Sequence, residues 1–60
     1  MAFVKYGHEL GDWVTTKKIH SSFAGYFEVG TLVKIIGWTE RGYDIEDAHG
    51  NKIYEIGWEV

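Results

Sequence analysis

The sequence predicts a small all-β domain, and three observations support this prediction. Eight glycines divide the 60 residues into short segments that are rich in β-branched and aromatic side chains. Turn signals at such short intervals are typical of an all-β sheet or barrel. Apolar and polar side chains alternate in the C-terminal third, as they do in a half-buried strand. The chain has no proline and no linker, so we expect one domain over residues 1–60.

The first predicted strand covers residues 12–19 (DWVTTKKI). A helix is the alternative, because Leu10, Trp13 and Val14 have helical spacing. The two following lysines interrupt that apolar stripe, and the Val-Thr-Thr run disfavours a helix. A strand is therefore the better prediction, and residues 20–25 (HSSFAG) are expected to form a loop.

Residues 30–38 (GTLVKIIGW) form the second predicted strand. Val33 and Ile35 alternate with Leu32 and Ile36, so both faces carry apolar side chains. This pattern indicates a strand at the centre of a curved sheet.

Residues 39–42 (TERG) form the next expected loop, and residues 43–47 (YDIED) the third strand. Period-two alternation places Tyr43 and Ile45 on one face, and the neighbouring carboxylates on the other.

A tight turn follows at residues 48–51, where Gly50 can adopt a positive φ. In the fourth predicted strand, residues 52–56, Tyr54 and Ile56 share a face opposite Ile53.

The order of these elements resembles the SH3-like barrel over residues 23–60. In that family an aromatic-x-x-Gly-polar diverging turn introduces a strand, and Phe27, Gly30 and Thr31 occupy the corresponding places. An aromatic residue opens the next strand, which Tyr43 matches.

The rest of the SH3-like pattern lies in the last eleven residues. Gly50 matches the glycine of the distal hairpin, and residues 55–60 (EIGWEV) lie where the family has a 3₁₀ turn and its last strand. The resemblance implies a small five-stranded SH3-like barrel with residues 59–60 as the fifth strand. The chain is also similar to small uncharacterised SH3-like proteins of Gram-positive bacteria and their phages.

Two features of the signalling SH3 proteins are missing. No Ala-Leu-Tyr-Asp-Tyr stretch is present, and the proline of the 3₁₀ turn is absent. A polyproline ligand is therefore not expected, although the aromatic walls that bind one could be built from Trp13, Trp38, Tyr43 and Trp58.

Composition limits the partners and the compartment. The chain has no cysteine, no stretch long enough to span a membrane and no signal-peptide pattern, so we expect a cytoplasmic protein. The net charge is −3, which disfavours non-specific nucleic-acid binding. The charge is uneven, because residues 40–60 carry six acidic and two basic side chains.

The favoured function is a non-enzymatic binding module that engages a protein partner. Interfaces favour Trp and Tyr, and acidic side chains flank the aromatic residues of the C-terminal half. The predicted partner-binding surface consists of Trp38, Glu40, Tyr43, Asp44, Glu46 and Trp58. The alternative for the two tryptophans is that they complete an undersized core.

Two other functions are kept open. A nucleic-acid-binding barrel would use charge and stacking from Trp13, Lys17, Lys18 and Lys34. A structural role would instead require an exposed strand that pairs between copies.

No pattern in the sequence indicates catalysis or a cofactor. His8, His20 and His49 lack the spacing of metal ligands, and no cysteine supports them. The serines after His20 are adjacent to it in sequence, which rarely produces a nucleophile–base pair. Asp44 and Glu46 are interpreted as a solvated strand face. We therefore expect no enzyme activity, no cofactor and no metal.

Overall fold

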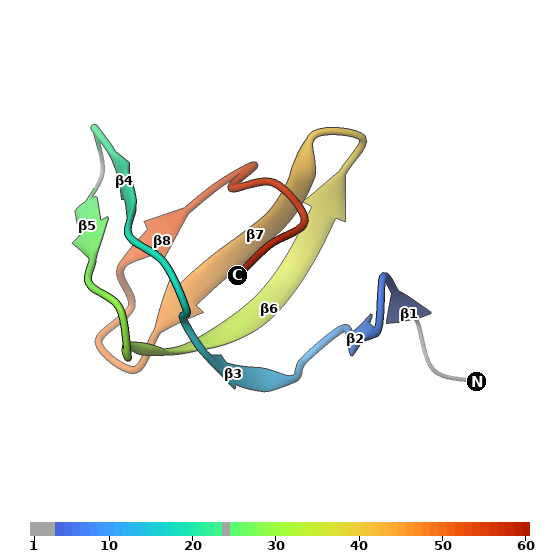
Figure 1. Cartoon of the computed structure of the whole chain (residues 1–60), viewed down its shortest axis with the longest axis horizontal. Coiled ribbons are helices and arrows are strands. Elements are labelled where there is room, and N and C mark those ends of the chain that lie inside the picture. The colour runs from blue at the N-terminus through green and yellow to red at the C-terminus, as the bar shows by residue number, and fades with distance from the viewer. Residues whose placement is uncertain (1–3, 24) are drawn as a thin grey trace.

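A long antiparallel hairpin forms the centre of the protein. The structure is a computed structural model that describes residues 4–23 and 25–60 (Figure 1). Strands β6 (Leu32–Thr39) and β7 (Gly42–Asp47) form this hairpin, with β3 (Trp13–Thr15) on one side and β8 (Lys52–Ile53) on the other. All pairings are antiparallel. The described residues contain no helix, so the all-β prediction is confirmed.

Two small hairpins lie at opposite ends of the molecule (Figure 1). One pairs β1 (Val4–Lys5) with β2 (His8–Glu9), and the other pairs β4 (His20–Ser22) with β5 (Gly25–Phe27). The described residues therefore form eight short strands in three separate sheets, where five strands were expected. No described residue belongs to a helix that could cross a membrane.

The second of these hairpins corrects two boundaries. Residues 20–25 were expected to be a loop, but His20 pairs with Phe27 and Ser22 with Gly25. The strand predicted over residues 12–19 is shorter, because β3 ends at Thr15. The helical alternative for this segment is not adopted.

Thr16 explains why β3 ends where it does. Its side chain is 1% exposed, its hydroxyl donates to the Glu28 carbonyl at 2.7 Å, and it accepts from the Thr31 amide at 3.0 Å. Its backbone also bonds to Gly30 and Thr31. These bonds hold Thr16 on the turn at residues 28–31, which leads into β6.

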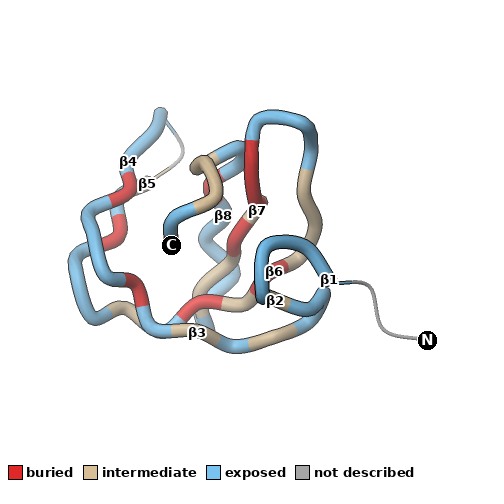
Figure 2. Tube along the Cα trace, turned by 45° about the vertical axis from the view of Figure 1, so that its right-hand side comes forward, coloured by how far each residue is buried: buried red, intermediate tan, exposed pale blue. Residues whose placement is uncertain are grey.

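The core lies on one face of the four-stranded sheet. Ile35, Ile45 and Ile53 are aligned across β6, β7 and β8, and each is at most 2% exposed. The buried positions along these strands alternate with exposed or half-buried ones (Figure 2). The other buried apolar residues are Phe27, Val33, Tyr43 and Val60. The predicted faces of the β6 and β7 segments are therefore confirmed.

The prediction for β8 requires a correction. Tyr54 and Ile56 were expected to share a face opposite Ile53. Tyr54 is 58% exposed and Ile53 is in the core, as expected, but Ile56 packs against the core and does not share the face of Tyr54. The strand ends at Ile53, and Glu55 adopts a positive φ of 54°. Period-two alternation therefore stops before Ile56, whose amide donates to the Tyr43 carbonyl.

A β-bulge in β6 changes the face on which Trp38 lies. Ile35 pairs with Ile45, whereas Gly37 pairs with Asp44, so Ile36 is the extra residue. A bulge of this kind shifts the alternation by one position. Trp38 consequently pairs with Tyr43 and lies on the core face with Ile35.

The C-terminal segment packs against the core without forming the expected fifth strand. Residues 59–60 belong to no strand, yet Val60 is only 8% exposed. The Val60 backbone oxygen accepts hydrogen bonds from the Lys17 amide and from Nε2 of the buried His20. These bonds attach the end of the described chain to the segment between β3 and β4 and to the first residue of β4.

Candidate functional site: a cleft beside Trp58

Tyr43 is the centre of the aromatic cluster. Its side chain is fully buried, and its ring makes edge-to-face contacts with Trp38 at 6.3 Å and with Trp58 at 5.1 Å between centroids. Its hydroxyl donates to the Lys5 carbonyl. Burial, together with the nearby Tyr6 phenol, raises the pKa of Tyr43. Tyr43 therefore supports the two tryptophans from inside and presents no area to a partner.

A close backbone contact holds the segment before Trp58 against β7. The Tyr43 amide donates to the Gly57 carbonyl at 3.0 Å, and the Ile56 amide donates to the Tyr43 carbonyl at 2.9 Å. Gly42 has a φ of 134°, and a Cβ on it would lie 2.3 Å from the Gly57 Cα. Only glycine permits this approach, so the sequence at Gly42 helps to set the position of Trp58.

The N-terminal hairpin covers Trp58 from another side. Tyr6 and Gly7 have φ values of 49° and 86°, as a two-residue type I′ turn requires. The Tyr6 ring contacts the Trp58 ring at 4.6 Å, and the Lys5 ammonium lies 5.7 Å from the Trp58 ring. Trp58 is thus held by two tyrosines and a cation, and it remains half-buried.

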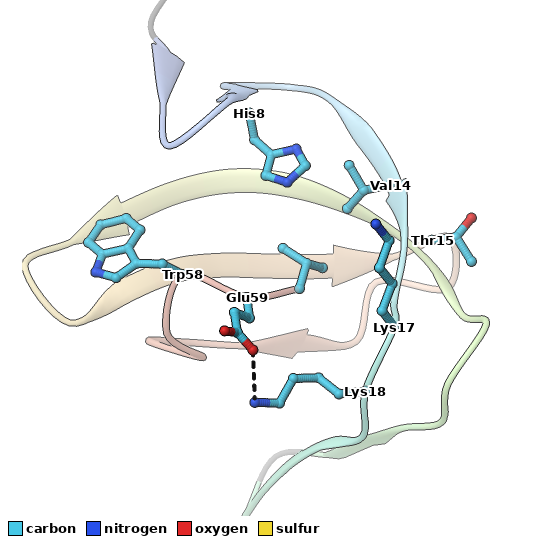
Figure 3. A pocket seen from close by; sticks show the side chains of 8 residues that line it. His8, Val14, Thr15, Lys17, Lys18, Trp58 and Glu59 are labelled. Carbon is cyan, nitrogen blue, oxygen red and sulfur yellow. Dashed lines mark ion pairs between the residues drawn. The ribbon is translucent and has the colours of Figure 1, made fainter.

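A cleft of about 600 Å³ opens beside Trp58 (Figure 3). Trp58 lies at one end of the cleft, and Val14 and Lys17 lie at the other, with His8 between them (Figure 3). Lys18 and Glu59 form an ion pair at 4.0 Å on its rim. The lining residues are His8, Val14, Thr15, Lys17, Lys18, Trp58, Glu59 and Val60.

The three predicted acidic residues do not surround this aromatic cluster. Glu40 is exposed in the turn between β6 and β7. Asp44 and Glu46 alternate with Tyr43 along β7, and so lie on the opposite face of the sheet. There the Asp44 carboxylate accepts a hydrogen bond from the Glu55 amide at 2.9 Å.

Glu46 also has neighbours on that outer face. It pairs in register with Lys34 on β6 and with Lys52 on β8. Cross-strand neighbours of opposite charge stabilise a sheet, so Glu46 has a structural role at this position. Of the six residues predicted to contact a partner, the structure brings together Trp38, Tyr43 and Trp58, and of these only Trp58 lines the cleft.

The four residues of the predicted nucleic-acid surface fall on two different faces. Trp13 is 48% exposed, and the Lys34 ammonium lies 5.7 Å from its ring on the outer face of the sheet. Lys17 and Lys18 instead line the cleft. The chain therefore presents two separate pairs of these residues and no continuous basic strip.

The histidines have separate environments. His8 packs edge-to-face on Tyr43 at 5.6 Å, while His20 donates to the Val60 oxygen. The His49 amide donates to the Asp47 carboxylate in the turn between β7 and β8. Within residues 4–23 and 25–60, no three potential ligand side chains are grouped to hold a metal ion.

Sequence reasoning did not find the cleft. His8 and Val60 are far apart in the sequence, and no motif joins them. The available signal was the Tyr6-Gly7 pair, which forms the turn that brings β2 to the C-terminal segment.

Phe23, predicted to lie in a loop, is fully exposed at the tip of the β4–β5 hairpin.

Comparisons with protein-family models, curated proteins and solved structures found no match for this chain. The candidate site therefore rests on its own geometry.

Proposed function

We propose that this protein is a non-enzymatic binding module that engages a protein partner through the Trp58 cleft. The observation that carries this proposal is the half-buried Trp58, which lines a cleft of about 600 Å³ while its ring is held by Tyr6 and Tyr43. A rigid aromatic side chain in a concave site binds with little loss of conformational entropy.

The size and chemistry of the cleft support a peptide-like occupant. Its volume lies within the range of about 300–1,000 Å³ that is typical of ligand sites. Val14, Val60 and Trp58 supply apolar area, and the lysines on the rim supply hydrogen-bond donors. This combination matches an extended segment that inserts one apolar side chain.

The SH3-like barrel is part of the same proposal. The proposal is supported by the order of the described elements from residue 28 onward: a turn at residues 28–31, β6, β7, a tight turn and β8. In this interpretation the C-terminal segment occupies the place of the last strand. The Trp58 cleft then lies where the N-terminal hairpin meets that segment.

Peptide selection followed by NMR tests the function. A random peptide library displayed on phage is selected against the protein, and an enriched peptide is titrated into ¹⁵N-labelled protein. We expect the largest shifts at the Trp58 indole and at the amides of His8 and Lys17. Lys34 and Lys52, on the outer face of the sheet, should not move. A selection that enriches no sequence, or shifts that avoid the cleft, would refute the proposal.

Nucleic-acid binding is the alternative proposal. It is favoured by one observation, the Lys34 ammonium over the half-exposed ring of Trp13, because bases stack on such rings. Glu46 pairs with Lys34 in the strand register, and its negative charge disfavours phosphate binding at this position. Labelled single-stranded oligonucleotides titrated at low and moderate salt decide this alternative, because absence of salt-sensitive binding rules it out.

A further inference from the structure

The Trp58 cleft concentrates positive charge on a protein that is negative overall. The net charge is −3, with six Lys and Arg residues in the whole chain. Two of these six, Lys17 and Lys18, line the cleft, and His8 lines it as well. A third, Lys5, places its ammonium 5.7 Å from the Trp58 ring. Half of the basic side chains therefore lie in the cleft lining or beside the ring of Trp58.

Glu59 is the one acidic side chain among the described residues that line the cleft. It pairs with Lys18 at 4.0 Å, but its side chain is 88% exposed. An exposed pair at this distance is weak, so Lys18 remains available to an incoming anion. Neither ion pair of the described residues includes Lys17. The two lysines thus outnumber the one glutamate in the cleft lining, whereas acidic residues outnumber basic ones in the chain as a whole.

We propose that the partner segment that binds this cleft is acidic and carries one aromatic or large aliphatic side chain. This inference rests on the proposed function and specifies its ligand. The apolar side chain packs against Trp58, while carboxylates on the same segment contact Lys17 and Lys18. Because residues 40–60 carry six acidic side chains, like-charge repulsion disfavours such a segment on the acidic parts of the surface.

A peptide fits these observations better than a nucleic-acid strand. A strand of nucleic acid needs a basic groove that follows its phosphates, whereas the two cleft lysines lie next to each other and Lys34 lies on another face. An acidic peptide needs only one or two cations beside an apolar contact.

The test uses three pools of short degenerate peptides, each with a central aromatic residue. Their flanking positions are drawn from Asp, Glu, Ser and Gly in the acidic pool, from Asn, Gln, Ser and Gly in the neutral pool, and from Lys, Arg, Ser and Gly in the basic pool. Retention on the immobilised full chain is measured by mass spectrometry. We expect the acidic pool to be retained about fourfold more than the neutral pool, since two exposed ion pairs each contribute roughly a factor of two.

Two matched variants locate the effect. Lys17→Gln combined with Lys18→Gln should lower retention of the acidic pool about fourfold, and both side chains are on the surface. Lys52→Gln, which removes one exposed charge from the outer face, should leave retention unchanged. Amide NMR spectra of all variants confirm the fold.

The outcomes separate this inference from the proposed function. If the neutral pool is retained as well as the acidic pool and shifts the Trp58 indole, the binding module stands and the acidic specificity is refuted. If no pool is retained and none shifts the NMR signal of the Trp58 indole, both proposals fail. If an oligothymidylate binds more tightly than every peptide pool, and the double variant loses this binding, the occupant is a nucleic acid and the peptide proposal is refuted. A sedimentation mass that rises with concentration, and falls in the double variant, would identify a second copy as the occupant.

Discussion

Gly42→Ala adds only one methyl group, yet the structure predicts that it greatly lowers the free energy of unfolding. The new Cβ would lie 2.3–2.4 Å from the backbone N, Cα and O atoms of Gly57. The Gly42 φ of 134° is also unfavourable for an L-amino acid. The backbone at Gly57 must therefore move away from β7.

The magnitude follows from what that movement breaks. Backbone strain at such a φ contributes about 1–3 kcal/mol, and the two hydrogen bonds between Tyr43 and residues 56–57 contribute about 1 kcal/mol each. We expect a loss of about 3–5 kcal/mol in the free energy of unfolding. A 60-residue domain has only about 3–9 kcal/mol in total, so the variant should be largely or partly unfolded.

Urea unfolding followed by tryptophan fluorescence measures this loss. Gly25→Ala is the matched control, because a Cβ there meets no atom within 4 Å and its φ lies outside the left-handed region. The control should stay within about 1 kcal/mol of the parent. A Gly42→Ala variant that is as stable as the Gly25→Ala control would refute the close-contact argument.

Three further predictions concern stability and pH. Thr16→Val should lower the free energy of unfolding by about 1–3 kcal/mol, because it removes a buried hydroxyl that both donates and accepts; the exposed Thr15→Val is the control in urea titrations. Burial raises the pKa of Tyr43 above its ordinary value of 10.0, so the unfolded chain loses this proton first and stability should fall as pH rises above that value. Tyr43→Phe should flatten this alkaline decline, and an unchanged decline would contradict the assignment. The Asn51 side-chain hydrogen bond lowers the pKa of Asp47 below 3.8, a contribution to stability that is present above that value and lost as pH falls. In Asn51→Ala the pKa of Asp47, followed by carboxyl NMR, should move upward.

The inward face of β7 and the turn after it were predictable from the local sequence. Tyr43 and Ile45 are both fully buried, as period two requires, and Gly50 occupies the turn between β7 and β8 with a φ of 88°. Such signals depend only on neighbouring residues, so they can be recognised without knowledge of the rest of the fold. The same reasoning failed at Ile56, because β8 ends at Ile53 and Ile56 packs against the core.

The candidate site was predictable only in part. Trp58 was identified as a partner-binding residue, and it lines the cleft. The acidic residues expected around it lie elsewhere, since Asp44 and Glu46 alternate with Tyr43 on β7. Spacing along the chain gave no indication that His8 would approach Val60, because that approach depends on the N-terminal hairpin docking on Tyr43.

Alternation, glycine placement and the many aromatic side chains were enough to specify a small β protein and the inward faces of β6 and β7. These properties act between neighbours along one strand, so each short segment carries its own information. The face of Trp38 was settled by the pairing of β6 with β7, and the position of Trp58 by contacts between segments distant in sequence. The bulge at Ile36 arises from the fit of β6 to β7, and the contact between Gly42 and Gly57 exists only when the chain has folded back on itself.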